Sequence, residues 1–429
     1  MSAGSGQFPD SSADPLTSGL DLYIVGGAVR DRLLGQPAGD RDFVVVGATP
    51  EEMIRRGFRP VGRDFPVFVH PQSGEEYALA RTERKSGRGY HGFVFHTGPE
   101  VSLSEDLARR DLTINAIAEA PDGRLIDPHG GVADLRACCL RHVSPAFRED
   151  PVRLLRLARF AARFEHFEIA PDTLALCRQM VADGEIEHLV AERVWNELAG
   201  ALMTASPSRF FRVLRSTGAL AVILPELDAL FGIPQDPRYH PEIDTGEHVL
   251  MVLDQAARLD AGLESRFACL VHDLGKGLTP ADQLPAHHGH ERSGLAPIDA
   301  VCRRLRVPNA CRDMALLVGR WHLMAHQAGG LRAATLLQLL EHLDVFRRPE
   351  RLEPFLLACE ADRRGRLGSE EASYPQARLI RQAATAARAV PVEPLLARGL
   401  KGEGIAHALR AERIRAIKAM QRNEGQKIS

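Results

Sequence analysis

Two aspartates near the N-terminus give the first chemical signal in the sequence. Asp40 and Asp42 stand two residues apart, just before and at the start of the apolar run DFVVVG. Residues two apart in a strand point to the same face, so these carboxylates would lie side by side and need a cation between them. Oxygen ligands of this kind suit Mg²⁺ shared with the phosphates of a nucleotide. Alone, the pair is equally consistent with two polar residues at the start of a strand that bind nothing.

A glycine pair upstream favours the magnesium interpretation. Residues 22–25 predict a strand and residues 28–34 a helix, with Gly26 and Gly27 as the turn between them. Glycine lets another group approach the backbone, and the first amides of a helix attract anions. Arg30 lies one turn into that helix. A lone Gly-Gly is more often a plain tight turn, but together with Asp-x-Asp it predicts a metal–triphosphate site.

An arginine stripe supplies a local polyanion site in a chain that has no overall positive charge. The formal net charge is −2 over 429 residues, so no global field attracts nucleic acid. Arg153, Arg156 and Arg159 recur every three residues, and a helix would align them on one face. Such a stripe is in isolation as often a solvated face. Leucines between the arginines indicate a helix packed on one side, which favours triphosphate and acceptor-end binding.

The elements that must position these residues change character along the chain. Short strand-like runs occupy residues 22–25, 43–47, 66–70, 76–81 and 93–96. From about residue 150, helical periodicity dominates. We therefore predict an α+β head with a mixed sheet, followed by an all-α neck, body and tail. Seven scattered cysteines indicate a reducing compartment, and no apolar run is long enough to span a membrane, so we expect a cytoplasmic protein.

Further motifs follow in order, and together they resemble a known family. RRDLTINAIA, DPHGGVADL and EDPVRLLRLARF come after GGAVRD and DRD. This order resembles the polymerase-β-like nucleotidyltransferase superfamily, in its bacterial CCA-adding and poly(A) polymerase branch. With HPEIDTGEHVL and HDLGKG included, about 400 of the 429 residues resemble the multifunctional CCA proteins, tRNA nucleotidyltransferases that carry an HD-type phosphohydrolase domain.

The resemblance implies a division of the chain and a set of ligands. The implied regions are a disordered leader (1–20), the nucleotidyltransferase head (21–145), a base-recognition and tRNA-binding neck (146–230), the HD domain (244–347) and a helical tail (348–429). The implied partners are tRNA, ATP and CTP, with no membrane, and we expect a monomer or homodimer. A basic last helix would contact the tRNA backbone, or simply be a solvated terminal helix.

In the head, the resemblance implies that Asp40 and Asp42 are catalytic and hold Mg²⁺. The implied nucleotide-binding residues are Gly27, Arg30, Arg110, Arg156 and Arg159, together with Asp150 and Arg153, which match a pair that distinguishes C and A from G and U without a template. A carboxylate offers only acceptors and an arginine only donors, which suits this task. Glu76 and Asp111 are both candidates for a third carboxylate, and residues 80–93 are either a mobile loop of the pocket or an ordinary surface loop.

A second metal-ligating pattern lies in VHDLGKG. His248 lies 24 residues before His272, and Asp273 directly follows His272. Imidazole and carboxylate together suit a divalent transition metal, which lowers the pKa of bound water to give a nucleophile. A lone His-Asp pair is more often structural. The resemblance implies that these three residues hold the metal of an HD site, with His272 and Asp273 catalytic. It also implies 2′,3′-cyclic phosphodiesterase, 2′-nucleotidase and phosphatase activities with Ni²⁺ or a similar ion.

Other residues around this second pattern stay open. His322 matches a further family histidine, although Leu323 replaces the aspartate that usually follows it, and Asp362 is a candidate for the distant aspartate of the set. The loop HHGH, with His287, His288 and His290, would ligate metal, contact phosphate or be solvated. Two rival functions also remain, a poly(A) polymerase with the same head and an RNA-binding module with an inactive head.

Overall fold

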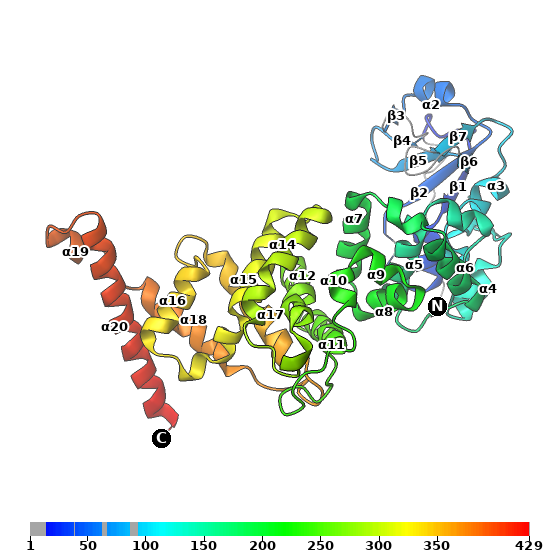
Figure 1. Cartoon of the computed structure of the whole chain (residues 1–429). Coiled ribbons are helices and arrows are strands. Elements are labelled where there is room, and N and C mark those ends of the chain that lie inside the picture. Colours follow the sequence, from blue (N-terminus) through cyan, green and yellow to red (C-terminus); the bar gives the residue numbers. More distant parts are fainter. Residues whose placement is uncertain (1–13, 38, 62–66, 86–92, 429) are drawn as a thin grey trace. The chain divides into compact units, whose positions relative to one another are not determined.

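The computed structural model describes residues 14–37, 39–61, 67–85 and 93–428 (Figure 1). Two compact units divide the chain. The first comprises Met1–Arg193 and Ser216–Ala219, and the second comprises Val194–Arg215 and Leu220–Ser429. The boundary falls inside the predicted neck, within helix α7 (Ala191–Leu202).

A mixed sheet forms the centre of the first unit. Its strands lie in the order β3-β4-β5-β2-β1-β8-β9. Their bounds are β1 Asp21–Val25, β2 Asp42–Val46, β3 Arg59–Pro60, β4 Val67–Val69, β5 Glu76–Leu79, β8 Ala118–Glu119 and β9 Leu125–Ile126. Strands β2 and β5 run parallel and the other pairs run antiparallel. The α+β class predicted for this part of the chain is confirmed.

The central strands are apolar because both of their faces are covered. Phe43, Val44 and Val45 of β2 are all buried, as expected for a strand in the middle of a sheet packed on two sides. The Phe43 ring stacks on Tyr77 of β5 with ring centroids 4.6 Å apart. This packing fixes the register of β2 against β5, and with it the position of Asp42 at the start of β2.

Helices and two small strand pairs complete the first unit. The helices are α1 Gly27–Leu33, α2 Pro50–Arg56, α3 Leu103–Ala108, α4 Gly131–Arg136, α5 Val152–Arg163 and α6 Pro171–Ala182. Strand β6 (Arg81–Lys85) pairs with β7 (Phe93–Thr97), and β10 (Cys139–Leu140) pairs with β11 (Glu168–Ile169). Residues 86–92 of the loop predicted over 80–93 lie outside the described residues.

The predicted disordered leader is described by the structure only over its last residues. Residues 1–13 lie outside the described residues, but residues 14–20 form a turn. Thr17 is buried there, and the Asp14 carboxylate lies 3.1 Å from Nε2 of His70. The last residues of the predicted leader therefore pack on the head.

The second unit is helical, as predicted. The helices that follow α7 along the chain are α8 Ser208–Thr217, α9 Ala219–Ile223, α10 Pro225–Asp228, α11 Thr245–Arg258, α12 Leu263–Val271, α13 His290–Ser293, α14 Leu295–Arg304, α15 Asn309–His326, α16 Ala333–His342, α17 Leu352–Arg364, α18 Pro375–Arg388, α19 Glu393–Ala397 and α20 Glu403–Ile428. Helices α11, α12, α15 and α17 pack against one another. In the part of the chain described, no helix has the length and apolar character needed to cross a membrane.

The basic last helix has partners within its own unit. Arg410 of α20 forms an ion pair with Glu341 of α16, with 3.1 Å between Nε and Oε1. The Arg413 guanidinium lies 3.8 Å from the ring centroid of Phe346. These contacts give part of the basic face a structural role, which the sequence pattern alone did not indicate.

Candidate active sites

A charged pocket of about 550 Å³ opens in the first unit, beside the glycine turn. Gly26 has φ +70°, a conformation that only glycine adopts without strain, and a Cβ there would lie 3.2 Å from Nη1 of Arg110. The turn therefore brings the chain backbone close to the pocket. The pocket lining includes Gly27, Arg30, Asp42, Glu76, Arg110, Asp111, Asp150, Arg153, Arg156 and Arg159.

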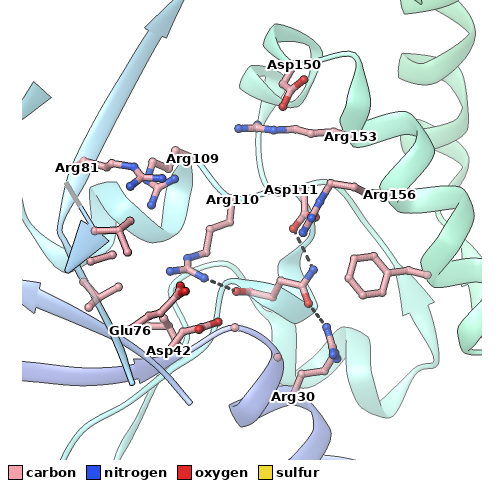
Figure 2. A pocket seen from close by; sticks show the side chains of 18 of the residues that line it. Arg30, Asp42, Glu76, Arg81, Arg109, Arg110, Asp111, Asp150, Arg153 and Arg156 are labelled. Atoms are coloured by element: carbon pink, nitrogen blue, oxygen red, sulfur yellow. Dashed lines mark hydrogen bonds and ion pairs between the residues drawn. The ribbon is translucent and has the colours of Figure 1, made fainter. Parts of the chain in front are cut away.

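Two carboxylates stand next to each other at one side of this pocket. Asp42 and Glu76 are register partners on the parallel strands β2 and β5, and Figure 2 shows their side chains together. Partial removal from water, with repulsion from Glu76, raises the pKa of Asp42, and the charge of Asp40 adds to the effect. Asp40 itself is exposed and is not part of the lining.

Asp111, the other candidate third carboxylate, has a different environment. Its Oδ2 accepts from Nε of Arg156 at 2.7 Å, and its Oδ1 accepts from Asn115 at 2.9 Å. Burial opposes ionisation of Asp111, but Arg156 and the hydrogen bonds outweigh it and lower the pKa to about 2. The negative charge of Asp111 is therefore balanced within the protein. The side chains of Asp42 and Glu76, in contrast, have no hydrogen bond or ion pair to another described residue.

Arg30, which was predicted to contact an anion, makes several contacts within the protein. Its guanidinium donates to Asp31 at 2.8 Å and to the Asn115 side chain at 2.6 Å, and lies 5.1 Å from the ring centroid of Phe160. Only 4% of Arg30 is exposed. These contacts offset the free-energy cost of burying the Arg30 charge. Arg30 therefore supports the wall of the pocket next to Gly27.

The predicted base-reading pair has a partner that the sequence did not indicate. Both carboxylate oxygens of Asp150 accept from Arg193, at 3.1 and 2.7 Å, and Arg193 also lines the pocket. Arg153 donates to the Ala146 carbonyl at 3.1 Å. Arg193 lies 43 residues beyond Asp150, at the start of another helix, so no local pattern connects the two.

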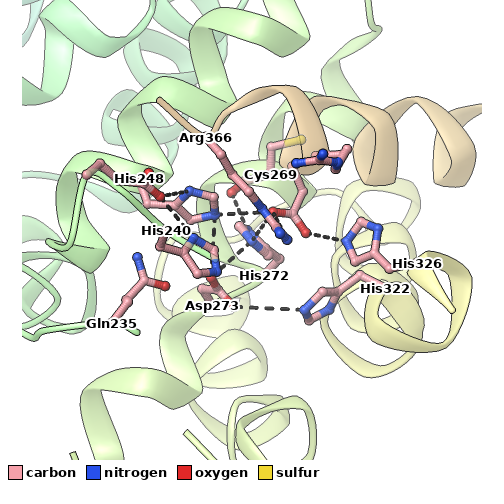
Figure 3. Close-up of polar contacts among 12 residues, drawn as sticks. Gln235, His240, His248, Cys269, His272, Asp273, His322, His326 and Arg366 are labelled. Carbon is pink, nitrogen blue, oxygen red and sulfur yellow. Dashed lines mark hydrogen bonds and ion pairs between the residues drawn. The ribbon is translucent and has the colours of Figure 1, made fainter. Parts of the chain in front are cut away.

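A second cluster of polar side chains lies buried in the second unit (Figure 3). Nε2 of His248 lies 3.1 Å from Oδ1 of Asp362, and Nε2 of His272 lies 3.2 Å from Oδ2 of Asp273. Across these pairs, His248 to Asp273 and His272 to Asp362 each measure 3.9 Å. The fold therefore brings together residues from α11, the end of α12 and α17, including Asp362.

A partner outside the cluster fixes the tautomer of His272, and Glu242 lies beside His248. Nδ1 of His272 donates to the Cys269 carbonyl at 2.8 Å, and Nδ1 of His248 lies 2.9 Å from Oε1 of Glu242. With Nδ1 protonated, Nε2 of His272 offers a lone pair to the cluster, the arrangement found behind metal-ligating histidines. Nε2 of His248 instead donates to the Asp362 carboxylate, and its Nδ1 makes no hydrogen bond to a described residue. Asp362 is oriented in a similar way, because its Oδ2 lies 2.6 Å from Nε2 of His326. The sequence pattern missed Glu242 and His326.

The histidines of the HHGH loop have three different environments. His290 is buried, and its Nε2 lies 3.3 Å from Oδ1 of Asp273. His287 contacts the Thr279 hydroxyl and the Pro234 carbonyl, and His288 is exposed. His322 is also buried, with Nε2 at 3.9 Å from Oδ1 of Asp273, and burial lowers its pKa to about 3.

Three family models match successive parts of the chain. Residues 22–141 match the poly A polymerase head domain, residues 166–231 the probable RNA and SrmB-binding site of polymerase A, and residues 245–359 the HD domain. His248, His272, Asp273, His290 and His322 all lie inside the last match. The predicted order of a nucleotidyltransferase head and an HD body is confirmed.

Close relatives share almost the full length of the chain. The multifunctional CCA protein of Alkalilimnicola ehrlichii is 63% identical over 406 residues, covering 94% of this chain and 98% of the relative. That of Pseudomonas fluorescens is 61% identical over 402 residues, covering 93% and 98%.

Solved structures with the same fold are more distant in sequence. The Bacillus stearothermophilus CCA-adding enzyme in complex with CTP has a TM-score of 0.64 at 24% identity, covering 98% of this chain and 99% of that one. The Thermotoga maritima CCA-adding enzyme complexed with tRNA has a TM-score of 0.62 at 19% identity, covering 96% and 92%. These similarities establish the fold.

Proposed function

The chain belongs to the family of multifunctional CCA proteins, and on that basis we propose that it adds the 3′-terminal CCA of tRNA from CTP and ATP without a nucleic-acid template. One observation carries the proposal. Asp42 and Glu76 stand side by side, without an ion pair to another described residue, in a pocket lined by arginines and the glycine turn. This arrangement suits a metal-bound triphosphate.

The donor set of the head fits Mg²⁺. Asp42 and Glu76 offer only oxygen ligands, and Asp40, two residues before Asp42, would add another. Burial, with repulsion from Glu76 and Asp40, raises the pKa of Asp42. When bound, Mg²⁺ would polarise the α-phosphate and favour ionisation of the tRNA 3′-hydroxyl. Arg110, Arg156 and Arg159 line the pocket around the carboxylates, where their positive charge would bind the triphosphate and offset the charge that develops as pyrophosphate leaves.

Glu76→Gln and Asp111→Asn distinguish the two candidate third carboxylates. We expect Glu76→Gln to lower the CTP incorporation rate about 100-fold or more, and to raise the Mg²⁺ concentration needed for half the maximal rate, because it removes a metal ligand. Asp111→Asn removes the charge that pairs with Arg156, so its expected effect is a lower melting temperature. Rates across a Mg²⁺ titration, with thermal unfolding of both variants, give the answer. A shifted Mg²⁺ dependence in Asp111→Asn alone would reverse the assignment.

Asp150 and Arg153 would select the base, with Arg193 holding Asp150 in position. We expect Asp150→Ala to lower the preference for CTP over UTP about 10- to 100-fold, because each unmade hydrogen bond in a site costs about 1–3 kcal/mol. Arg148→Ala is the matched control, since Arg148 pairs with Asp183 on the exposed surface and does not line the pocket. Single-nucleotide incorporation with each triphosphate measures the preference. An unchanged preference in Asp150→Ala would remove this residue from base selection.

For the buried cluster, we propose a metal-dependent phosphohydrolase with 2′,3′-cyclic phosphodiesterase, 2′-nucleotidase and phosphatase activities. His248, His272, Asp273 and Asp362 would hold Ni²⁺ or another divalent transition metal. Ligand atoms about 2.0–2.2 Å from a tetrahedral ion lie roughly 3.3 Å from one another, and the observed separations are 3.1–3.9 Å. Nε2 of His272 is buried without a hydrogen bond to any described residue, and a bound ion would supply a partner.

The cluster has groups suited to a phosphate ester. When bound, the ion would lower the pKa of a water molecule so that it attacks phosphorus. Lys276 lies 2.6 Å from Oδ2 of Asp273, and Lys276, Arg238 and Arg366 line an adjoining cavity of about 710 Å³. Opening a 2′,3′-cyclic phosphate at its 3′ bond, followed by loss of the 2′-phosphate, frees the 3′-hydroxyl that nucleotide addition uses.

Product analysis tests the leading proposal. A tRNA that lacks its 3′ end is incubated with CTP, ATP or both, and the products are sequenced. We expect two C residues with CTP alone and a complete CCA with both nucleotides. A long A tail with ATP would favour the rival poly(A) polymerase, and no incorporation of either nucleotide would favour an inactive head.

A further inference from the structure

We propose that Gln235 and Arg366 bind the phosphate group of the substrate in the cavity beside the buried cluster, each through a side-chain N–H that no described residue accepts. This inference deepens the proposed hydrolase and rests on it. Neither residue is among the proposed ligands of the ion. Both line the cavity of about 710 Å³, and Figure 3 shows both side chains next to the histidines of the cluster.

Lys276 fixes the orientation of the Gln235 amide. Nζ of Lys276 donates to Oε1 of Gln235 at 2.5 Å and lies 2.6 Å from Oδ2 of Asp273. An ammonium group has three donors and no acceptor, so the amide oxygen of Gln235 has to face Lys276. The amide nitrogen Nε2 therefore points away from Lys276, and its two N–H groups are left for another acceptor.

The amide nitrogen of Gln235 is a buried donor without an acceptor. Its Nε2 makes no hydrogen bond to a described residue, and only 2% of Gln235 is exposed. Buried polar groups in native proteins are nearly always paired, because an unpaired donor lowers stability. A glutamine that lines a cavity can meet this requirement when a ligand brings the acceptor.

Arg366 supplies a second donor from a different part of the chain, two residues after the end of α17. Its Nε is buried and donates to no described residue, and 17% of its side chain is exposed. Its Nη2 lies 4.0 Å from Oδ1 of Asp362, which is an ion-pair distance but too long for a hydrogen bond. A guanidinium donates readily to the oxygens of a phosphate, so the free Nε–H suits the same ligand as the Gln235 amide.

The charges around the cavity favour an anion once the proposed ion is bound. Among the described residues of the lining, three cationic side chains balance three anionic ones: Arg238, Lys276 and Arg366 against Asp236, Asp273 and Asp362. A divalent ion in the cluster therefore leaves an excess of positive charge. A phosphate ester offers negative charge together with several acceptor oxygens, which the two unpaired donors require.

The loop that carries Gln235 is held in place before a substrate arrives. The Gln235 amide N–H of the backbone donates to the Ile243 carbonyl at 2.7 Å, and the Pro234 carbonyl accepts from Nε2 of His287 at 3.0 Å. Ile243 has φ +62°, which is rare for a β-branched residue. Strained backbone of this kind is concentrated at functional sites. A donor positioned in advance lowers the entropic cost of binding.

Two substitutions of Gln235 distinguish a contact with the substrate from a merely structural role. Gln235→Glu keeps an oxygen for Lys276 and removes both N–H donors, whereas Gln235→Met removes the oxygen and the donors. If Gln235 only held Lys276, glutamate would be the better tolerated of the two. Contact with phosphate predicts the opposite order, because the carboxylate also repels the substrate. We expect the KM for adenosine 2′,3′-cyclic phosphate to rise about 10-fold in Gln235→Met and at least 100-fold in Gln235→Glu.

Arg366→Lys tests the second donor independently of Gln235. It keeps the positive charge and removes the Nε–H, so we expect a KM about 10-fold higher. In all three variants kcat should change much less than KM, because a phosphate contact is made in the ground state as well as in the transition state. Gln283→Glu and Arg292→Lys are the matched controls, since both residues are exposed and neither lines the cavity. Both controls should keep the KM of the wild-type protein.

Inorganic phosphate gives a readout of binding that does not depend on turnover of each variant. It should inhibit hydrolysis by the nickel-loaded wild-type protein competitively, with an inhibition constant at least 10-fold weaker in Gln235→Glu and in Arg366→Lys. Nickel content and thermal unfolding are measured for every variant and should match those of the wild-type protein. Since the two donors lie in different segments, Arg366→Lys carries the test if a substitution of Gln235 prevents folding.

The possible failures are distinguishable. Unchanged KM and unchanged phosphate inhibition in Gln235→Glu and Arg366→Lys would overturn the phosphate site and leave the proposed hydrolase standing. A smaller effect in Gln235→Glu than in Gln235→Met, or a loss of nickel from these variants, would give the residues a structural role and overturn the site as well. A wild-type protein that hydrolyses no phosphate ester would overturn both proposals.

Discussion

Asp42→Asn should abolish CCA addition, with a loss of at least about 1,000-fold in the rate of CTP incorporation, and leave phosphate-ester hydrolysis unchanged. A metal ligand at the reacting phosphate contributes several kcal/mol to the transition state, and each 1.4 kcal/mol is a factor of ten in rate. Asp42 is the only carboxylate that lines the pocket from the strand following the glycine turn. The amide keeps its size and removes its charge.

The matched control for this variant is Asp21→Asn. Asp21 begins β1, and its register partner is Val46 at the far end of β2, whereas Asp42 pairs with Val25 at the opposite end of β1. We expect normal CTP incorporation in Asp21→Asn. Near-normal incorporation in Asp42→Asn, or an equal loss in both variants, would contradict the assignment of Asp42 to the metal. Single-turnover assays with a tRNA ending before CCA supply the measurement.

His272→Ala should show the opposite selectivity. We expect at least about a 1,000-fold loss of 2′,3′-cyclic phosphate hydrolysis, with CTP and ATP incorporation unchanged. His272 is 1% exposed, and its Nε2 lies within 3.9 Å of both Asp273 and Asp362. The substitution removes one ligand from the site in which these two buried carboxylates would bind the ion. The affinity of the site for the ion that activates water should therefore fall.

His407→Ala serves as the control for a histidine lost from the second unit. His407 lies on the exposed side of α20, and we expect normal hydrolysis from this variant. Full hydrolysis by His272→Ala would show that the activity comes from another place in the protein. A loss of metal without loss of activity would separate the buried cluster from the chemistry.

The parts of the fold that follow from local chemistry could be predicted from the sequence. The strands at 22–25 and 43–47 appear within one residue of their positions as β1 and β2, because apolar runs bounded by glycine and aspartate define both their faces and their ends. The α5 stripe also follows from periodicity. Its leucines are buried, and Arg153, Arg156 and Arg159 line the pocket.

Contacts between distant segments could not be predicted in this way. The pairing of β2 with β5 places Glu76 beside Asp42, and the pairing of Asp111 with Arg156 gives that carboxylate a structural partner. The sequence alone does not show which of Glu76 and Asp111 lies beside Asp42, because both are acidic residues near apolar strands or motifs. Arg193, Glu242 and His326 were missed for the same reason. Each contacts a residue that is far away in the chain or across a turn, and no characteristic sequence spacing marks the pair.

A tRNA that ends in a 2′,3′-cyclic phosphate before its CCA tests most directly whether one chain carries both chemistries at two separate sites. The wild-type protein, with CTP, ATP, Mg²⁺ and Ni²⁺, should convert this tRNA into one that ends in CCA. Asp42→Asn should stop at the 3′-hydroxyl, and His272→Ala should leave the cyclic phosphate in place. A mixture of the two variants should again produce CCA. Extension by Asp42→Asn alone, or removal of the cyclic phosphate by His272→Ala alone, would contradict the account.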